Sequence, residues 1–320
     1  MGDEWLQGGW GDPLKGKEGC LGGFWRTETC CCHVHVVMGN EACDLDSTVS
    51  ALAMAYFLAQ SSPAPGAAFV PVLNIPRADF ALRTETTFLL RDRGVPAASL
   101  IFRDEIDLGG LHHAGLLSLT LVDHHVLADA ALEEAVVEVL DHRPLERERG
   151  PPCRVTVEPV GSCATLVTER IAQGPPGLLD RTTAALLHGT ILLDCINLSP
   201  AAGKVTPRDV ACVALLEERF PELPPRDSVF GALQAAKFDV SGLTTEQMLR
   251  KDLKVISGDE LVLAISGVYV DLEVRLGGEG TGDLKKRTYP KKKGGSLAVV
   301  GTPGGGTAGS VMVRHRSVGV

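Results

Sequence analysis

The chain alternates short apolar runs with longer stretches in which apolar residues recur at helical spacing. Short runs rich in Val, Leu and Ile are typical of buried strands, and the longer stretches are typical of helices. The predicted strands cover residues 33–39, 69–75, 99–102, 118–122 and 136–140. The predicted helices of the same region cover residues 48–60, 83–93, 162–172, 181–193 and 207–219. Strands that alternate with helices indicate α/β architecture, with a parallel sheet covered on both faces.

Polar residues at two predicted helix starts agree with this interpretation. Asp46 or Ser47 is suited to cap the helix at 48–60, because a short polar side chain accepts from the free N–H groups of a first turn. Thr206 is suited to cap the helix at 207–219, with Pro207 in the first turn. We therefore expect these helices to begin directly after the capping residues.

The pattern breaks after residue 220. Pro221, Pro224 and Pro225 stiffen this stretch, and we place an interdomain linker here. Further elements follow it, and they predict a smaller α/β domain: helices at 228–236 and 244–250, and a strand at 261–272. The predicted organisation is an irregular leader (1–32), a main α/β domain (33–220), a partial second domain (226–275) and a Gly/Lys-rich disordered tail (276–320).

The two ends differ in composition from the middle. All three tryptophans lie within residues 1–32, and the tail carries lysine-rich clusters at 285–287 and 291–293. We interpret the segments 1–32 and 274–320 as products of alternative splicing or of an imperfect gene model. The lysine clusters are typical of a nuclear-import signal, and equally of a solvated tail.

The net charge of −9 excludes a general nucleic-acid binder, since such proteins carry excess Lys and Arg. A phosphate-bearing substrate would therefore need positive charge from metal ions or from a few placed cations. No apolar run reaches the ~18–20 residues of a membrane span, and the first residues lack an apolar signal-peptide segment. We expect no membrane insertion and a cytoplasmic location, with the nucleus as an alternative.

Cysteine usage indicates reduced thiols. The chain has nine cysteines, an odd number, and no export signal. The run Cys30-Cys31-Cys32 beside His33 and His35 suggests a zinc site, but adjacent cysteines cannot all face one ion without strain. We favour an exposed thiol run.

Acidic residues and histidines follow several of the apolar runs. Asp44 and Asp46 follow the strand at 33–39, and in an extended turn both carboxylates can face one point at the carboxyl edge of the sheet. Asp-His-His at 123–125, Asp-His-Arg at 141–143 and Asp194 each end a further apolar run. Any one of them has a plain explanation as a cap, turn or surface residue. Together they indicate a site for Mn²⁺, Mg²⁺, iron or zinc.

These motifs, in this order and followed by Glu-Pro-Val-Gly-Ser-Cys-Ala-Thr at 158–165, resemble the DHH phosphoesterases. That superfamily includes family II inorganic pyrophosphatases, exopolyphosphatases and RecJ-like nucleases. The motif at 39–47 and the segment 237–249 resemble the prune branch of short-chain exopolyphosphatases. The resemblance covers residues 33–273, and it implies a DHH catalytic domain followed by a DHH-associated domain that is truncated or replaced.

The resemblance implies a metal site that holds two divalent ions, Mn²⁺ or Mg²⁺. Its metal ligands would be Asp44, Asp46, Asp123, His142 and Asp194. Asp123 and His142 would thereby also be catalytic.

Further residues would act on the substrate. The resemblance places His124 and Arg143 beside the ions as catalytic and substrate-binding residues, and it adds Asn40 and Lys237 as substrate-binding residues. Pyrophosphatases of the superfamily have a histidine in place of Asn40 and a second histidine in place of Arg143. An amide is a weaker metal ligand than imidazole, and Arg binds phosphate as a fork. Both differences favour the exopolyphosphatase type.

The predicted function is metal-dependent hydrolysis of short-chain inorganic polyphosphates or of small phosphodiesters such as cyclic nucleotides. Two alternatives stay open: a weakly active or inactive regulatory protein that retains the metal site, and an inorganic pyrophosphatase. A RecJ-like nuclease is disfavoured by the net negative charge. The resemblance also implies signalling proteins as partners.

Overall fold

The computed structural model describes residues 33–62, 67–145 and 152–251, and the backbone of four later strands. The predicted leader at 1–32 and both lysine clusters lie outside the described residues. Contacts within the chain define two compact units: Ala81–Thr84 and the chain from Ala235 onward form the second, and the remainder forms the first.

The first unit is built on a six-stranded parallel sheet with the order β3-β2-β1-β4-β5-β6. The strands are β1 (Val34–Met38), β2 (Ala68–Leu73), β3 (Ile101–Phe102), β4 (Leu117–Val122), β5 (Val136–Asp141) and β6 (Arg154–Val157). The chain fills one side of the sheet from β1 to β3 and then crosses to β4, on the other side of β1. The strand order therefore reverses between β1 and β4, the place where open α/β sheets bind ligands.

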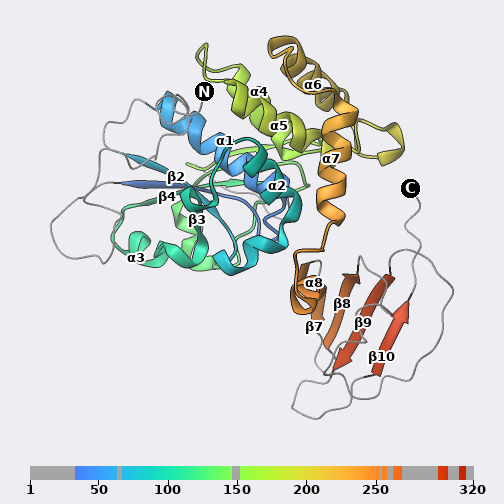
Figure 1. Ribbon diagram of the computed structural model, residues 1–320. Helices are drawn as coiled ribbons and strands as arrows, with labels where there is room; N and C mark the ends of the chain where they lie inside the picture. Colours follow the sequence, from blue (N-terminus) through green and yellow to red (C-terminus); the bar gives the residue numbers. More distant parts are fainter. Residues whose placement is uncertain are drawn as a thin grey trace. The chain divides into compact units, whose positions relative to one another are not determined.

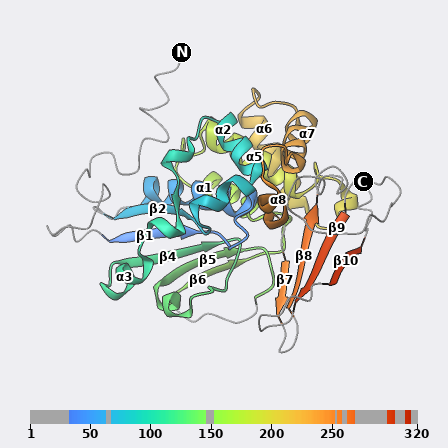
Figure 2. The same cartoon turned by 60° about the horizontal axis from the view of Figure 1, so that its bottom comes forward.

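Helices cover both faces of this sheet. The face with the larger core carries α1 (Leu45–Ser61), α2 (Thr84–Asp92), α4 (Cys163–Ala172), α5 (Arg181–Asp194) and α6 (Pro207–Arg219). The opposite face is covered by α3 (Leu108–His113) and a 3-10 turn at Ala130–Ala135 (Figures 1 and 2). Val37 packs into the first core and its neighbours Val36 and Met38 into the second, as alternation along a strand requires. The predicted α/β class is confirmed.

The start of α1 differs from the prediction in a way that matters for the site. The helix begins at Leu45 and is capped by Asp44, which accepts from Ser47 N at 3.1 Å. The predicted cap, Asp46 or Ser47, is wrong, because the chain enters the helix earlier than the apolar pattern indicates. Asp46 instead lies in the first turn, where its carboxylate is available to other groups. The predicted cap Thr206 of α6 is confirmed by a capping box with Asp209.

The prolines do not divide the chain as expected. Helix α7 (Arg226–Phe238) follows them, and its residues Val229 and Leu233 pack into the core of the first unit. The boundary between the units falls after Gln234, inside α7. The stretch from Pro221 to Pro225 therefore separates α6 from α7 instead of separating domains.

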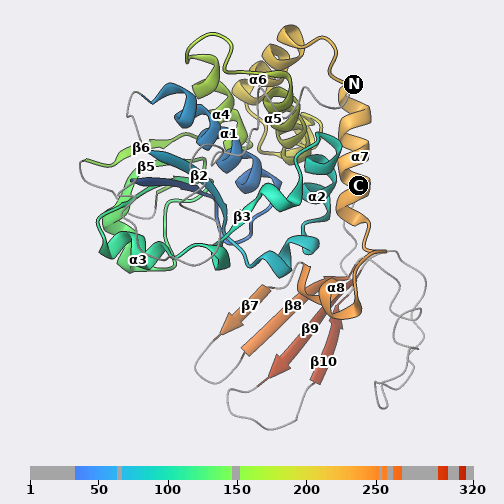
Figure 3. The same cartoon turned by 60° about the vertical axis from the view of Figure 1, so that its left-hand side comes forward.

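The second unit contains α8 (Thr245–Lys251) and a four-stranded antiparallel sheet with the order β10-β9-β8-β7 (Figure 3). The strands are β7 (Lys254–Ser257), β8 (Val262–Val268), β9 (Gly295–Gly301) and β10 (Ser310–Arg314). Lys251 of α8 is buried and donates to Leu82 O at 3.0 Å, which ties the short segment Ala81–Thr84 to this unit. Strands β9 and β10 lie within the stretch predicted as the tail, and their apolar residues stand among many glycines that obscured the strand pattern.

None of the helices in the described part of the chain combines the length and the apolar character that a membrane crossing requires.

A left-handed turn follows α5. Ile196, Asn197 and Leu198 have φ values of 47°, 53° and 60°, a conformation that is costly for side chains other than glycine. Ile196 is β-branched, and 48% of its surface is exposed, so little packing is lost when its side chain is removed. The turn lies directly after the last turn of α5, which carries Asp194.

We expect Ile196→Gly to raise the free energy of unfolding by up to about 1 kcal/mol, because glycine adopts positive φ without the Cβ clash. Val210→Gly is the matched control, since Val210 is also β-branched and 43% exposed but lies inside α6. That change should lower stability by about 1 kcal/mol. Urea unfolding of both variants measures the change in the free energy of unfolding and its sign. A loss of stability in Ile196→Gly would show that the backbone at Ile196 is not strained.

Candidate metal centre

The candidate site lies where the loops after β1 and β4 meet. Gly39 and Asn40 follow β1, and Asp123 follows β4, so both loops stand at the carboxyl edge beside the strand reversal. A Cβ on Gly39 would approach Ser47 Cβ to 2.7 Å and Ser47 O to 2.8 Å. Glycine at this position therefore allows the first turn of α1 to approach the end of β1.

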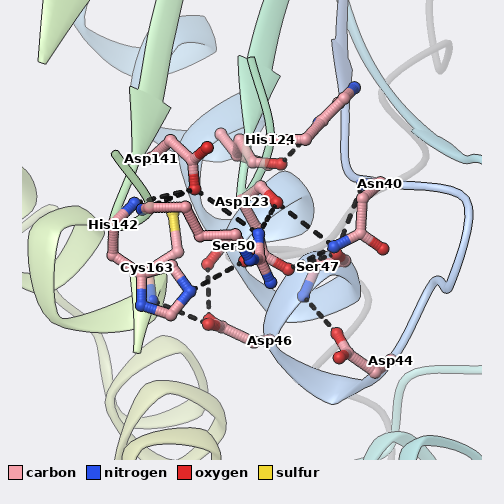
Figure 4. A network of polar contacts seen from close by, with 12 residues as sticks. Asn40, Asp44, Asp46, Ser47, Ser50, Asp123, His124, Asp141, His142 and Cys163 are labelled. Atoms are coloured by element: carbon pink, nitrogen blue, oxygen red, sulfur yellow. Dashed lines mark hydrogen bonds and ion pairs between the residues drawn. The ribbon is translucent and has the colours of Figure 1, made fainter. Parts of the chain in front are cut away.

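Asp123 is the centre of the site. It is fully buried and has a left-handed backbone, with φ of 60°. Its Oδ2 accepts from Asn40 Nδ2 at 2.8 Å and from Ser47 Oγ at 2.5 Å. Its peptide oxygen accepts from Asn40 Nδ2 at 3.1 Å (Figure 4). The same oxygen accepts from Arg143 Nη1, which also lies 2.9 Å from Oδ1. Groups from two loops and from the first turn of α1 thus converge on one buried carboxylate.

Asp46 faces the amino-terminal end of α4. Its carboxylate accepts from Cys163 N at 2.7 Å, Ala164 N at 2.8 Å and Ser50 Oγ at 3.2 Å. Burial raises the pKa of Asp46, and the negative charge of Asp123 adds to the rise, while His142 and the two N–H groups oppose it. The free N–H groups and dipole of the helix favour the charged form at this place.

His142 completes the group. Its Nδ1 lies 2.9 Å from Val160 O, an oxygen that can only accept, so Nδ1 carries the proton and Nε2 of the neutral ring has the lone pair. Burial lowers the pKa of His142, but the contacts with Asp123 and Val160 outweigh it, and the net pKa is raised. Nε2 faces Asp123 Oδ1 at 3.2 Å.

The residues present fit a divalent cation. Asp123 Oδ1 and His142 Nε2 are buried and make no hydrogen bond among the described residues, although Oδ1 has an ion pair with Arg143 Nη1 at 2.9 Å. One ligand atom from each of Asp46, Asp123 and His142 lies within 4.8 Å of the others. Polar atoms without a hydrogen bond are costly to bury, and a cation bound by the three side chains would compensate Asp123 Oδ1 and His142 Nε2. Carboxylate oxygens with one imidazole suit Mn²⁺ and Mg²⁺, as well as iron and zinc.

Two predicted metal ligands lie outside this group. Asp44 accepts from Ser47 N as the cap of α1. Asp194 is partly buried at the end of α5; burial raises its pKa well above the usual value, and the charges of Asp46 and Asp44 raise it further. The roles of Asp44 and Asp194 as ligands stay predictions.

The predicted substrate residues are placed in part. His124 contacts Val122 O at 3.0 Å through Nδ1, and burial lowers its pKa. Arg143 borders the site with 48% of its side chain exposed. Lys237 belongs to the second unit, so its role toward the substrate stays a prediction.

Sequence analysis missed the residue that supports the Asp-His-Arg motif. Asp141 is fully buried and accepts from His125 Nδ1 at 2.6 Å, His142 N at 2.7 Å and Arg143 N at 3.3 Å. It therefore fixes the backbone that carries His142 and Arg143. The near-repeat of the two Asp-His motifs was the available signal. Ser47 was considered only as a cap, although its hydroxyl contacts Asp123.

A second buried acid holds the loop between β6 and α4. Asp209 accepts from Gly161 N at 3.0 and 2.9 Å, from Thr165 Oγ1 at 2.6 Å and from Thr206 Oγ1 at 2.7 Å. Residues of the same loop serve the site, since Val160 contacts His142 and the start of α4 contacts Asp46. Asp209 is thus a positioning residue for both ligands.

We expect Asp209→Ala to lower the free energy of unfolding by about 3 kcal/mol, because several buried donors lose their acceptor. Manganese affinity should fall about 10- to 100-fold in the protein that stays folded. Asp129→Ala is the control, since Asp129 caps an exposed turn by accepting from Ala131 N at 3.0 Å; we expect little change. Equal denaturation midpoints for the two variants would contradict the role of Asp209.

The fold and this centre define the class: an α/β protein that carries a candidate metal site at the strand reversal of a parallel sheet, followed by a smaller second unit. Residues 35–191 match the N-terminal domain of the DHH family, and residues 231–302 match the DHHA2 domain. The chain belongs to the DHH family, as its motifs predicted. The second match continues past residue 275, where we expected that domain to end, and it includes β9.

Relatives with assigned names agree with this membership. The chain is 61% identical over 245 residues to Exopolyphosphatase PRUNE1 of Homo sapiens, a match that covers 76% of this chain and 54% of that protein. It is 30% identical over 282 residues to a Schizosaccharomyces pombe protein assigned as an exopolyphosphatase, with coverage of 83% and 71%. The chain therefore spans about half the length of the PRUNE1 relatives that it matches.

The fold also resembles a solved structure. A crystal structure of a Methanococcus jannaschii protein assigned as a family II inorganic pyrophosphatase superposes with a TM-score of 0.52 at 24% identity. The match covers 69% of this chain and 67% of that one. At this identity the likeness shows the fold alone.

Proposed function

We propose that the chain is a metal-dependent phosphohydrolase that cleaves phosphoric anhydride bonds of short-chain inorganic polyphosphates. The observation that carries the proposal is the group formed by Asp46, Asp123 and His142, which each offer one ligand atom within 4.8 Å of the others. The relatives named exopolyphosphatases support the choice of substrate. Mn²⁺ and Mg²⁺ are the proposed cations, because two of the three ligands are hard carboxylate oxygens.

A divalent cation held by Asp46, Asp123 and His142 would polarise a phosphoryl oxygen and lower the pKa of a water molecule. The chain's own residues hold that position rigidly. Asp46 is fixed by the N–H groups of α4, and His142 by the carbonyl of Val160. Ligands oriented in this way need no rearrangement when substrate binds.

Arg143 supplies positive charge beside the buried carboxylates of the site. Its Nη1 is anchored to Asp123, while 48% of the side chain is exposed toward solvent. The planar guanidinium matches the oxygens of a terminal phosphate. Arg143 would thereby orient the phosphoryl group and neutralise the charge that develops on its equatorial oxygens.

The test is phosphate release from tripolyphosphate and tetrapolyphosphate with Mn²⁺ or Mg²⁺. We expect the activity of Asp123→Asn to fall by more than ~10–100-fold, the loss typical of changing a residue that only supports a metal ligand. Here the proposed ligand itself is removed. Asparagine keeps the shape and tolerates the left-handed backbone of Asp123. Asp129→Asn, at an exposed acid, is the control and should retain full activity. A folded wild-type protein that binds metal without releasing phosphate would instead favour the regulatory alternative.

Arg143→Lys keeps the charge but removes the planar fork. We expect phosphate release to fall on the order of 100-fold, as for loss of one donor to a developing oxyanion. Arg154→Lys is the matched control, because Arg154 is an exposed arginine of β6. Steady-state kinetics on tripolyphosphate compares the two variants with the wild type. Unchanged kcat and KM in Arg143→Lys would show that Arg143 does not bind the phosphate.

A further inference from the structure

The two carboxylate oxygens of Asp123 have different surroundings. Oδ1 faces His142 Nε2 at 3.2 Å, on the side where Asp46 lies. It makes no hydrogen bond within the described residues, and its other neighbour is Arg143 Nη1, an ion pair at 2.9 Å. Oδ2 accepts from Asn40 Nδ2 at 2.8 Å and from Ser47 Oγ at 2.5 Å. Figure 4 shows His142 and Asp46 on one side of Asp123 and Asn40 and Ser47 on the other.

The orientation of the Asn40 amide is fixed by its neighbours. Its Oδ1 accepts from Ala42 N at 2.9 Å and from Cys43 N at 3.2 Å, and backbone N–H groups can only donate. Turning the amide would place its NH₂ group against two donors and its oxygen against the Asp123 carboxylate. Asn40 is therefore a donor to Asp123, and its oxygen is not presented to an ion on this side.

The direction of the Ser47 hydroxyl is fixed in the same way. Asn40 N donates to Ser47 Oγ at 3.3 Å, so the hydroxyl proton is directed to Asp123 Oδ2. Ser47 N donates to Asp44, the other acid on this side. Asn40 and Ser47 thus each donate one hydrogen bond to Oδ2.

We infer that the centre takes one divalent cation, on the Oδ1 side of Asp123, and that Asn40 and Ser47 close the Oδ2 side. A second ion bridging through Oδ2 would displace two hydrogen bonds to a buried carboxylate and would find an amide donor where a ligand is needed. Within the described residues, a single group of three ligand-type side chains lies close enough to hold an ion. This inference rests on the proposed metal-dependent function and departs from the two ions expected from the resemblance.

The first test counts Mn²⁺ per folded full-length chain by metal analysis after desalting and by EPR. Ions are counted as the difference between the wild type and Asp123→Asn, which subtracts ions bound elsewhere. We expect a difference of one, and a spectrum without exchange coupling between neighbouring ions. A difference of two with a coupled spectrum would overturn the inference and leave the proposed function intact. A folded protein that binds no ion would overturn both.

The second test is Asn40→Asp, which is isosteric. One oxygen can still accept from Ala42 N and Cys43 N, and the other would face Asp123 Oδ2 as a second carboxylate. We expect two Mn²⁺ per chain in this variant, with exchange coupling. The matched control is Asn197→Asp: Asn197 Nδ2 donates to Asp227 Oδ1 at 2.6 Å, so the same change creates an exposed acid pair. The control should keep one ion.

One ion in both the wild type and Asn40→Asp would overturn the assignment of Asn40 as the closing group. The wild-type count does not depend on how any Asn40 variant folds. Ser47→Ala removes the other donor to Oδ2 and provides a further check. If Asn40→Asp fails to fold, we expect Ser47→Ala to bind more than one Mn²⁺ per chain at saturating Mn²⁺. A count of one Mn²⁺ per chain in Ser47→Ala would contradict the role of Ser47.

Discussion

The buried charge of Asp123 is the constraint on which the rest of the site depends. A carboxylate taken out of water is unstable unless donors or cations surround it. Here the donors come from the loop after β1, from the first turn of α1 and from the loop after β5, through Asn40, Ser47 and Arg143. Satisfying one charge therefore joins the segment 40–47 to Asp123 and Arg143, which are distant from it in sequence. The left-handed backbone of Asp123 is part of the same arrangement, since it presents both the carboxylate and the peptide oxygen to those donors.

The helices contribute to the site as directly as the strands do. Asp46 is held by the N–H groups that the start of α4 leaves free, so the position of that helix sets the position of a ligand. Asp209 in turn fixes the loop before α4 from the first turn of α6. Ligand geometry thus depends on the packing of α1, α4 and α6, and a change in the helical core would reach the metal centre without touching a ligand.

Sequence reasoning predicted the parts of this structure that depend on local pattern. The apolar runs placed five of the six strands of the parallel sheet, all except β6, and the acids that follow those runs identified the edge where the site lies. It could not give the start of α1, because the choice of Asp44 over Asp46 as cap depends on where Asp46 finds its donors in α4. Asp209 was missed for a similar reason, since its partners come together only in the fold. The strands β9 and β10 were missed because glycine-rich surroundings diluted a pattern that pairing with β8 completes.

The same distinction explains why motifs alone do not give the number of ions. The acids of a family motif show which oxygens are present, but the protein's own donors decide which of those oxygens are still available to a cation. A histidine beside Asp123 would offer a ligand atom, whereas Asn40 offers a hydrogen bond, and Ser47 adds a second one to the same oxygen. Asn40 and Ser47 are neutral donors that stabilise the negative charge of Asp123 in part, as a second ion would. Unlike an ion, they add no positive charge to the site. The site then carries less positive field toward the substrate, which gives the exposed guanidinium of Arg143 a larger share of phosphate binding.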